Sequence, residues 1–231
     1  MKILVLNGSP KEENSTTMLM TNAFIEGIGN KEKTEVKKVN TYTKNIKYCK
    51  GDLACWFRQE GHCVAIQDDD MNDLLDDMVS SDMIIWSFPL HVHTMPASLK
   101  AVLDRTIALL KINMREFPEK VEHEKVVDLS AKKNVFIVSG GYPYYPDNFS
   151  GLKMQMQAYF NTPIMMCACE AALMAADSPE LNMLKERLFS DFRKAGEECA
   201  EKGQPSKETI DEIEKPMIPN SAYLNIMNNM K

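Results

Sequence analysis

The sequence has no uninterrupted apolar run of the length, about eighteen residues, that a membrane-spanning helix needs. It also lacks any block of Lys and Arg, and its net charge of −6 argues against a nucleic-acid surface. The N-terminus carries a single Lys and a short apolar run that ends in a turn, which is too short for a signal-peptide core and has no small-residue cleavage site. We therefore expect a cytoplasmic protein with no membrane and no nucleic-acid partner.

Several familiar signatures are missing as well. The dinucleotide fingerprint G-x-G-x-x-G and the phosphate loop G-x-x-x-x-G-K-[ST] are both absent. No Ser–His–Asp or paired-carboxylate arrangement and no internal repeat stands out. A chain of 231 residues can bury a large core without staples, so its six cysteines are expected to be reduced thiols or ligands.

The opening segment is the most informative feature that is present. Lys2–Leu6 (KILVL) is typical of a strand buried on both faces, and Asn7–Pro10 breaks it with turn residues. The cluster Asn14–Thr17 follows, at the start of a helical pattern. A strand, a turn and a hydroxyl-lined helix N-terminus predict a phosphate site, because backbone N–H groups and the helix dipole favour an anion there. An ordinary helix cap uses the same residue types, so both interpretations stay open at this point.

Strand-like and helical segments alternate along the rest of the chain. Five strands are expected, at Lys2–Leu6, Glu35–Val39, Met83–Phe88, Val135–Ser139 and Ile164–Cys167. Five helices are expected between or after them, at Thr17 to Gly29, Asp68 to Val79, Met95 to Leu110, Gly151–Asn161 and Glu180 to Glu201. This pattern predicts an α/β fold, a flavodoxin-like doubly wound five-stranded parallel sheet in the order 2-1-3-4-5 with helices on both faces.

Three loops should then converge at the carboxyl ends of strands 1, 3 and 4. The second loop is Pro89–Pro96, where Pro89 stiffens the chain and apolar groups follow. The third loop is Gly140–Asn148, where two glycines permit a close approach of the backbone and three tyrosines supply aromatic walls. Together with the opening loop they indicate a planar, phosphorylated cofactor.

The segments GSPKEENSTT, CKGDLACWFRQEGHCVAIQDDDM and SFPLHVHTMPASLKAVLDR resemble those of the flavodoxin-like NAD(P)H-dependent FMN reductases and their relatives, the iron–sulfur flavoproteins. The resemblance covers roughly residues 1 to 160. It implies FMN as cofactor and NADPH or NADH as reductant. The residues that it assigns to the FMN phosphate are Ser9, Lys11, Ser15, Thr16 and Thr17. The residues that it places around the flavin ring are Pro89, Leu90, His91, Val92, Ser139, Gly140, Gly141 and Tyr142.

The resemblance also implies a homodimer with its flavin sites near the subunit interface, and the composition of the last stretch, rich in Lys, Glu, Pro and Asn, indicates a separate tail. Residues 1–203 would form the FMN-binding domain, with a Cys-containing insertion at about 41–67. Residues 204–231 would form an extended tail that packs on the domain or on the partner subunit. Five apolar residues would give that tail a docking side: Met217, Ile218, Tyr223, Leu224 and Ile226.

The cysteine loop departs from the pattern of the iron–sulfur relatives. That pattern has four cysteines, and here Asp52 lies between Cys49 and Cys55, which leaves only Cys63 as a third. We expect an ordered loop of thiols without a cluster, and no metal site. The pair His91 and His93 suits a substrate pocket better than a metal, because no third ligand has matching spacing.

Three further features of the sequence have plain structural interpretations. The run Asp68–Asp70 serves the N-terminus of the helix that follows it. Asp104 and Arg105 are expected to be structural or interface charges. Cys167 and Cys169 are expected to lie in the core and at a strand end, so no metal or catalytic role is assigned to them.

The expected function is that of an FMN-dependent oxidoreductase. It would pass hydride from NAD(P)H through FMN to a flavin, a quinone or another small acceptor, with His91 and Tyr142 shaping the acceptor pocket. No catalytic side chain is assigned. Two alternatives are an electron carrier without turnover of its own and a non-catalytic binding module of the same fold.

Overall fold

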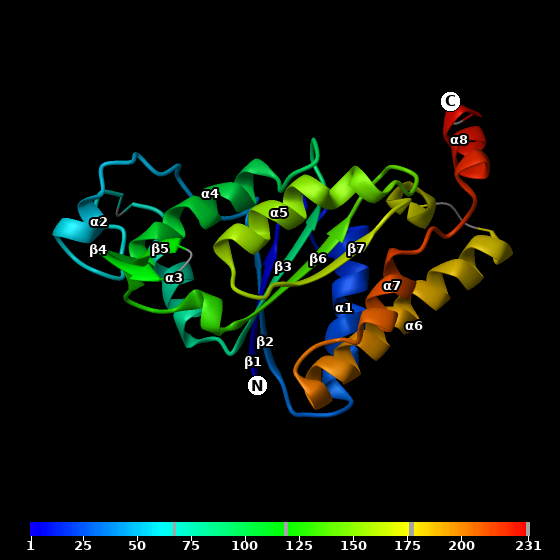
Figure 1. Ribbon diagram of the computed structural model, residues 1–231. Helices are drawn as coiled ribbons and strands as arrows, with labels where there is room; N and C mark the ends of the chain where they lie inside the picture. The colour runs from blue at the N-terminus through cyan, green and yellow to red at the C-terminus, as the bar shows by residue number, and fades with distance from the viewer. Residues whose placement is uncertain (67, 118–119, 176–177, 230–231) are drawn as a thin grey trace.

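The computed structural model describes residues 1–66, 68–117, 120–175 and 178–229 (Figure 1). The strands are β1 (Lys2–Asn7), β2 (Glu35–Asn40), β3 (Met83–Pro89), β4 (Leu110–Phe117), β5 (Lys120–Lys125), β6 (Lys133–Ser139) and β7 (Ile164–Ala168). The helices are α1 (Thr16–Gly29), α2 (Ala54–Phe57), α3 (Met71–Ser80), α4 (Ala97–Arg105), α5 (Ser150–Tyr159), α6 (Pro179–Lys202), α7 (Lys207–Glu214) and α8 (Asn220–Asn229). Among these residues no helix is both long and apolar enough to cross a bilayer.

Five strands form one parallel sheet in the order β2-β1-β3-β6-β7. Counted along the chain, these five strands are arranged 2-1-3-4-5, and each overlaps a predicted strand. The prediction lacked the antiparallel hairpin β4–β5. The expected helix Met95 to Leu110 therefore ends early, at Arg105, and a 3-10 turn over Thr106–Leu109 leads into β4. Apolar and polar residues alternate at the start of β4, which is the period of a strand.

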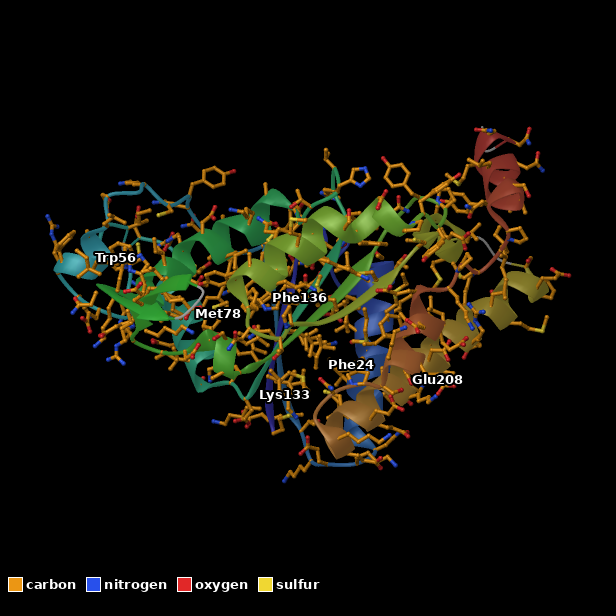
Figure 2. All side chains as sticks on the ribbon, in the orientation of Figure 1. Phe24, Trp56, Met78, Lys133, Phe136 and Glu208 are labelled. Carbon is orange, nitrogen blue, oxygen red and sulfur yellow. The ribbon has the colours of Figure 1, made fainter. Side chains whose placement is uncertain are left out.

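Helices cover both faces of the sheet, and successive residues of a strand point alternately into two cores, one on each face (Figures 1 and 2). In β3, Ile84 and Trp86 pack with α3, α4 and α5, whereas Met83 and Ile85 pack on the α1 and α6 side. The side chains labelled in Figure 2 include Phe136 of the first core and Phe24 of the second. A parallel sheet requires this double burial, since its crossover helices lie on its faces.

Helices α1 and α6 pack closely through two glycines. A Cβ atom at Gly27 would lie 1.9 Å from the carbonyl oxygen of Arg193, and one at Gly196 would lie 2.0 Å from that of Phe24. Helix α1 ends at Gly29, as the sequence predicted. Gly27, two residues before that end, serves the contact between the two helices.

The region after residue 203 forms the helices α7 and α8, which corrects the expectation of an extended tail. Ser206 begins α7 as an N-cap whose side chain accepts the N–H of Thr209. Ile213, Met217 and Tyr223 are buried in the core on the α1 and α6 side, so the segment packs on its own subunit. The proposed boundary between residues 203 and 204 stays a prediction, and residues 67, 118, 119, 176, 177, 230 and 231 of the proposed regions lie outside the described residues.

Candidate functional site

The three predicted loops meet at the carboxyl ends of β1, β3 and β6. The strand pairing sets Asn7 of β1 opposite Ser87 of β3, and Pro89 of β3 opposite Ser139 of β6. Backbone hydrogen bonds continue this alignment beyond the strands: the Gly8 N–H donates to the Ser87 carbonyl at 2.8 Å, and the Leu90 N–H donates to the Ser139 carbonyl at 2.7 Å. Each loop therefore starts from a fixed position beside its neighbour.

The first loop is held by contacts within its own sequence. Ser9 is buried, its N–H donates to the Asn7 side chain at 2.9 Å, and its hydroxyl accepts the N–H of Lys11 at 3.3 Å. The loop then forms a 3-10 turn over Glu12–Asn14. Ser15 caps α1, since its hydroxyl accepts the N–H of Met18 at 3.0 Å. Ser15 is thus a helix cap, which is compatible both with a phosphate site and with an ordinary capped turn.

Two features favour a ligand at this cap over a cap alone. The cap uses only one of the N–H groups in the first turn of a 14-residue helix, so the N–H groups of Thr16 and Thr17 have no acceptor within the helix. The Nδ2 atom of Asn7, at the end of β1, is buried without a hydrogen-bond partner within the described part of the chain. Since an unpaired buried donor costs about 1–3 kcal/mol, an acceptor from a ligand fits this position.

A row of hydroxyls lies directly beneath the first turn of α1. The Thr17 and Ser139 hydroxyls, both buried, hydrogen-bond to each other at 2.6 Å. One turn further along, the Thr21 hydroxyl donates to the Ser87 hydroxyl at 2.8 Å. These pairs tie the helix to the ends of β6 and β3. The sequence analysis gave Asn7, Thr21 and Ser87 no role in a site. The signal that could have found them is that each is a polar residue in an otherwise apolar segment.

The second loop forms a tight two-residue turn. His91 and Thr94 exchange backbone hydrogen bonds of 2.9 and 3.0 Å, and Val92 and His93 at the tip have φ values of 48° and 59°. This left-handed conformation is strained for a β-branched residue such as Val92. The turn also places His91 and His93 on a bend rather than on a strand, so they do not share a face as an H-x-H pair on a strand would.

The third loop is stacked against the second. The rings of Tyr142 and His93 are parallel, with centroids 5.7 Å apart, and the His93 Nδ1 atom lies 3.1 Å from the carbonyl oxygen of Asn148. Tyr142 thus contacts His93, whereas the sequence analysis had joined Tyr142 with His91 in the acceptor pocket. At the base of the loop, Gly140 is buried, and a Cβ there would lie 3.0 Å from the Phe149 ring.

The thirteen predicted cofactor residues lie on these three loops with graded exposure. Those that are buried are Ser9, Ser15, Thr17, Ser139 and Gly140. Those that are partly buried are Thr16, Pro89 and Leu90, and those that are exposed are Lys11, His91, Val92, Gly141 and Tyr142. Their roles toward a cofactor remain predictions, while their convergence at the carboxyl ends of the strands is a feature of the structure.

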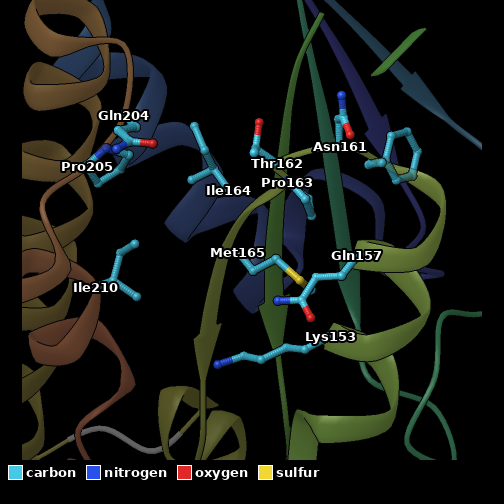
Figure 3. A pocket seen from close by; sticks show the side chains of 11 residues that line it. Lys153, Gln157, Asn161, Thr162, Pro163, Ile164, Met165, Gln204, Pro205 and Ile210 are labelled. Atoms are coloured by element: carbon cyan, nitrogen blue, oxygen red, sulfur yellow. The ribbon is translucent and has the colours of Figure 1, made fainter. Parts of the chain in front are cut away.

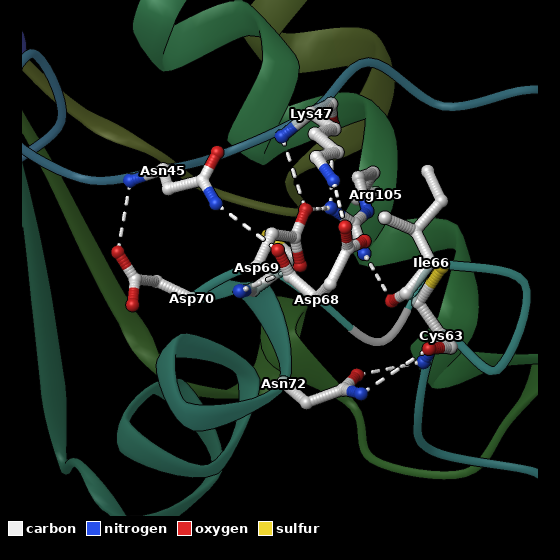
Figure 4. A network of polar contacts seen from close by, with 10 residues as sticks. Asn45, Lys47, Cys63, Ile66, Asp68, Asp69, Asp70, Asn72 and Arg105 are labelled. Atoms are coloured by element: carbon white, nitrogen blue, oxygen red, sulfur yellow. Dashed lines mark hydrogen bonds and ion pairs between the residues drawn. The ribbon is translucent and has the colours of Figure 1, made fainter.

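The cysteine loop lies in a different part of the molecule, next to a buried ion pair (Figure 4). Arg105 and Asp69, each 1% exposed in its side chain, form this pair, and Arg105 also donates to the Ile66 carbonyl at 3.4 Å. Asp69 additionally accepts the N–H of Met71 at the start of α3, so one aspartate of the run Asp68–Asp70 serves that helix, whereas Asp68 pairs with Lys47 and Asp70 accepts the N–H of Asn45. Arg105 is thus a structural charge that holds Lys47, Ile66 and Asp69 on the domain.

The three thiols of this loop differ in their surroundings. Cys49 is exposed, Cys55 is buried and Cys63 is partly buried, and with Asp52 they border a small cavity of about 20 Å³. Burial raises the pKa of the Cys55 thiol, and the neighbouring Cys63 raises it further. Within the described residues, no three His, Cys, Asp or Glu side chains are placed to hold a metal ion.

A hollow of about 500 Å³ lies beside the edge strand β7 (Figure 3). It lies between α5, the start of β7 and the segment that joins α6 to α7, with Gln157, Ile164 and Pro205 in its walls. Its cation, Lys153, is paired with Glu214 at 2.7 Å. Because this hollow is remote from the carboxyl ends of the strands and its charge is already paired, we assign it no role.

The sheet order defines the class, an open doubly wound α/β protein. In this class ligands bind at the topological switch point of the sheet. Comparison with known families identifies the family within this class. A family model described as the flavodoxin-like fold matches residues 1–170, about three quarters of the chain. The chain belongs to that family.

Curated relatives agree with the resemblance seen in the sequence. An iron–sulfur flavoprotein of Methanocaldococcus jannaschii is 32% identical over 106 residues, 46% of this chain and 52% of that protein. One of Methanosarcina thermophila is 31% identical over 113 residues, 49% of this chain and 56% of that protein. An FMN-dependent NADH:quinone oxidoreductase of Pseudoalteromonas atlantica is 28% identical over 114 residues, 45% of this chain and 53% of that protein. The chain thus spans about half the length of these relatives.

Solved structures share the fold at low sequence identity. An FMN-dependent NADH-azoreductase of Bacillus anthracis, solved with FMN, has a TM-score of 0.59 at 16% identity and covers 87% of this chain and 100% of its own. An NAD(P)H:quinone oxidoreductase of Methanothermobacter marburgensis has a TM-score of 0.60 at 15% identity and covers 86% and 96%. At these identities the likeness concerns the fold alone.

The cysteine loop of this chain does not fit the cluster that the names of two relatives imply. A four-thiolate cluster needs four cysteines, and Asp52 lies where the pattern has one of them. The raised pKa of Cys55 also opposes the thiolate form that a ligand must take. We therefore derive no step through an iron–sulfur cluster.

Proposed function

We propose that this protein is an FMN-dependent oxidoreductase that passes hydride from NADH or NADPH through FMN to a flavin, a quinone or another small acceptor. The observation that carries this proposal is the loop at Ser9–Thr17, where hydroxyls and the N–H groups of the first turn of α1 lie beside the Asn7 Nδ2 atom, which has no partner among the described residues. The names of the curated relatives and the fold of the solved FMN complex support the same cofactor. Bound FMN would supply the hydride and electron transfer.

The phosphate of FMN would be held by the first loop. The side chains of Ser9, Ser15 and Thr16 and the backbone N–H groups of Thr16 and Thr17 would donate to it, with Lys11 adding positive charge from the exposed side. Because the Thr17 hydroxyl is already paired with Ser139, its contribution would come from its N–H group. An acidic chain with a net charge of −6 can bind an anion in this way, since the donors are local and oriented.

The flavin ring would lie between the second and third loops. Pro89 to Val92 would cover one side, and Ser139 to Tyr142 would close the other. His91 and Tyr142 would shape the acceptor pocket, and the stacking of Tyr142 on His93 would hold its ring in place. The chain's part in the reaction would be to orient the ring and to limit water at its reactive edge.

Exposed side chains on and next to the second and third loops support a homodimer with its flavin sites near the interface. Four large side chains there are exposed, by 92% for Val92, 55% for Tyr142, 54% for Tyr145 and 71% for Met154. Apolar groups at this density are typical of a surface that contacts a partner or a ligand. Sedimentation of the protein at several concentrations would test the dimer.

The cofactor is tested by an absorption spectrum and by a double substitution. Ser9→Ala with Thr16→Ala should weaken FMN binding by about a hundredfold or more, since each of the two lost hydrogen bonds to a charged phosphate is worth about 1.5–3 kcal/mol. Titration of the apoprotein by flavin fluorescence measures the change. Ser80→Ala, at the exposed end of α3, is the matched control and should leave the affinity unchanged. Undiminished affinity in the double variant would show that the phosphate binds elsewhere.

Two alternatives give different results in the same samples. An electron carrier would bind FMN but oxidise no NADH or NADPH with small quinones, azo compounds or free flavin. A non-catalytic binding module would be colourless and would take up no FMN. Turnover of NADH or NADPH by the yellow protein would exclude both.

A further inference from the structure

The C-terminal residues 216–229, here called the C-terminal segment, contact the third loop. The Tyr223 hydroxyl donates to the Gly141 carbonyl, and the Asn220 side-chain amide donates to the Tyr144 carbonyl at 2.9 Å. Tyr223 is buried although it lies on the last helix, α8. These bonds join residues 82 and 76 positions apart. The segment therefore contacts the loop that would close over the flavin ring.

Glu170 connects the same two regions from below. It lies two residues after the end of β7, is fully buried, and has a φ of 60°. Its N–H donates to the Tyr142 carbonyl at 3.0 Å, and its Oε2 atom accepts the N–H groups of Met217 at 2.6 Å and Ile218 at 3.2 Å. One residue thus holds the third loop by its backbone and the C-terminal segment by its side chain.

The arrangement at Glu170 is costly for a purely structural joint. Its other carboxylate oxygen, Oε1, is buried without a hydrogen-bond partner among the described residues, and an unsatisfied buried polar atom is destabilising. A left-handed φ adds strain for a residue other than glycine. Strained and underpaired groups cluster at functional sites, where the surrounding structure holds them for a purpose.

We propose that the C-terminal segment, held by Glu170 and Tyr223, is a clasp that fixes the third loop in its flavin-binding conformation. Glu170 and Tyr223 are positioning residues, since they act through the carbonyls of Gly141 and Tyr142 and not on a ligand. The inference rests on the proposed function. It adds that FMN binding and closure of the clasp are thermodynamically coupled, so that each favours the other by the same factor.

The first test is a set of single substitutions in the full chain. Tyr223→Phe removes one hydroxyl, and Glu170→Gln keeps the side-chain shape but removes the charge that the two N–H groups share. Each should raise the Kd for FMN about tenfold, or ~1.4 kcal/mol, measured by fluorescence titration. Tyr159→Phe is the matched control, because it also breaks a tyrosine hydroxyl contact, with Thr106 at 2.7 Å, but far from the three loops. Its FMN affinity should stay that of the wild type.

The second test measures the response of the unmodified protein to FMN and then compares it with that of Tyr223→Phe. Addition of FMN should slow amide hydrogen exchange in residues 217–224, by severalfold, together with that of the third loop. In Tyr223→Phe the slowing should remain in the loop and be lost in the C-terminal segment. A merely structural role for Tyr223 would lower the stability without changing this response to FMN.

The outcomes separate the two proposals. If the wild type takes up no FMN, the proposed function fails and the clasp fails with it. If the wild type binds FMN but both variants keep its affinity, or exchange in residues 217–224 does not respond to FMN, only the clasp is overturned.

Discussion

The first and third loops of the candidate site are built in opposite ways. Residues 8–17 are fixed mostly by contacts two or three positions apart, such as those of Ser9 with Lys11 and of Ser15 with Met18. Residues 140–149 are fixed by distant partners, including His93 and Tyr223. The phosphate side of the site is thus preformed by local sequence. The ring side depends on the rest of the fold, so its geometry can change when a distant element moves.

The largest effect is expected at the buried hydrogen bond between Thr17, at the end of the first loop, and Ser139, the last residue of β6 before the third loop. Thr17→Val keeps the shape of the side chain but leaves the Ser139 hydroxyl unpaired, which should cost about 2–3 kcal/mol of the free energy of unfolding. Urea denaturation measures the loss. Thr17→Ser, which keeps the hydroxyl, should recover most of it. If Val and Ser variants were equally stable, the hydrogen bond would not join the loops.

The difference between the loops also explains what the sequence could predict. The strand KILVL, the turn after it and the cap at Ser15 are all encoded locally, and the structure has each of them in place. The sheet order followed because alternating strands and helices leave few topologies. The hairpin β4–β5 was missed because a helical pattern was extended through Leu110, where the alternation changes to a period of two.

Contacts of the third loop could not be predicted because they join residues far apart in the sequence. Nothing in Gly140–Tyr145 indicates that Glu170 or Tyr223 will bind its carbonyls. The apolar residues of the C-terminal segment were visible, but the surface that they cover was not. In the same way Tyr142 was joined with His91, and only the left-handed turn at Val92 shows why His93 is its partner.

A smaller effect is expected from the first loop alone. Ser15→Ala removes the N-cap of α1 and should cost about 1 kcal/mol of stability, as cap substitutions do. The change is local, so the stacking of Tyr142 on His93 should be unaffected. Thermal unfolding measures the stability, and Ser15→Asp, a residue that also caps helices, is the control that should restore it. A loss as large as that of Thr17→Val would mean that the first loop is not self-contained.

The smallest effect concerns the tip of the second loop, where the turn is closed by the local hydrogen bonds of His91 with Thr94 but is strained. Val92 is 92% exposed and has a φ of 48°, so its side chain gains little from packing while its backbone occupies an unfavourable region. Val92→Gly removes the strain of about 1–2 kcal/mol but adds about 0.5–1 kcal/mol of unfolded-state entropy, so a net gain of roughly 0.5 kcal/mol in stability is expected. Val121→Gly, at an exposed position on the hairpin strand β5, should instead be destabilising. If Val92→Gly is more stable but binds FMN more weakly, the valine is retained for the ring side of the site, and its strain belongs to function. If stability falls as it does for Val121→Gly, the turn is relaxed in solution and the second loop resembles the first.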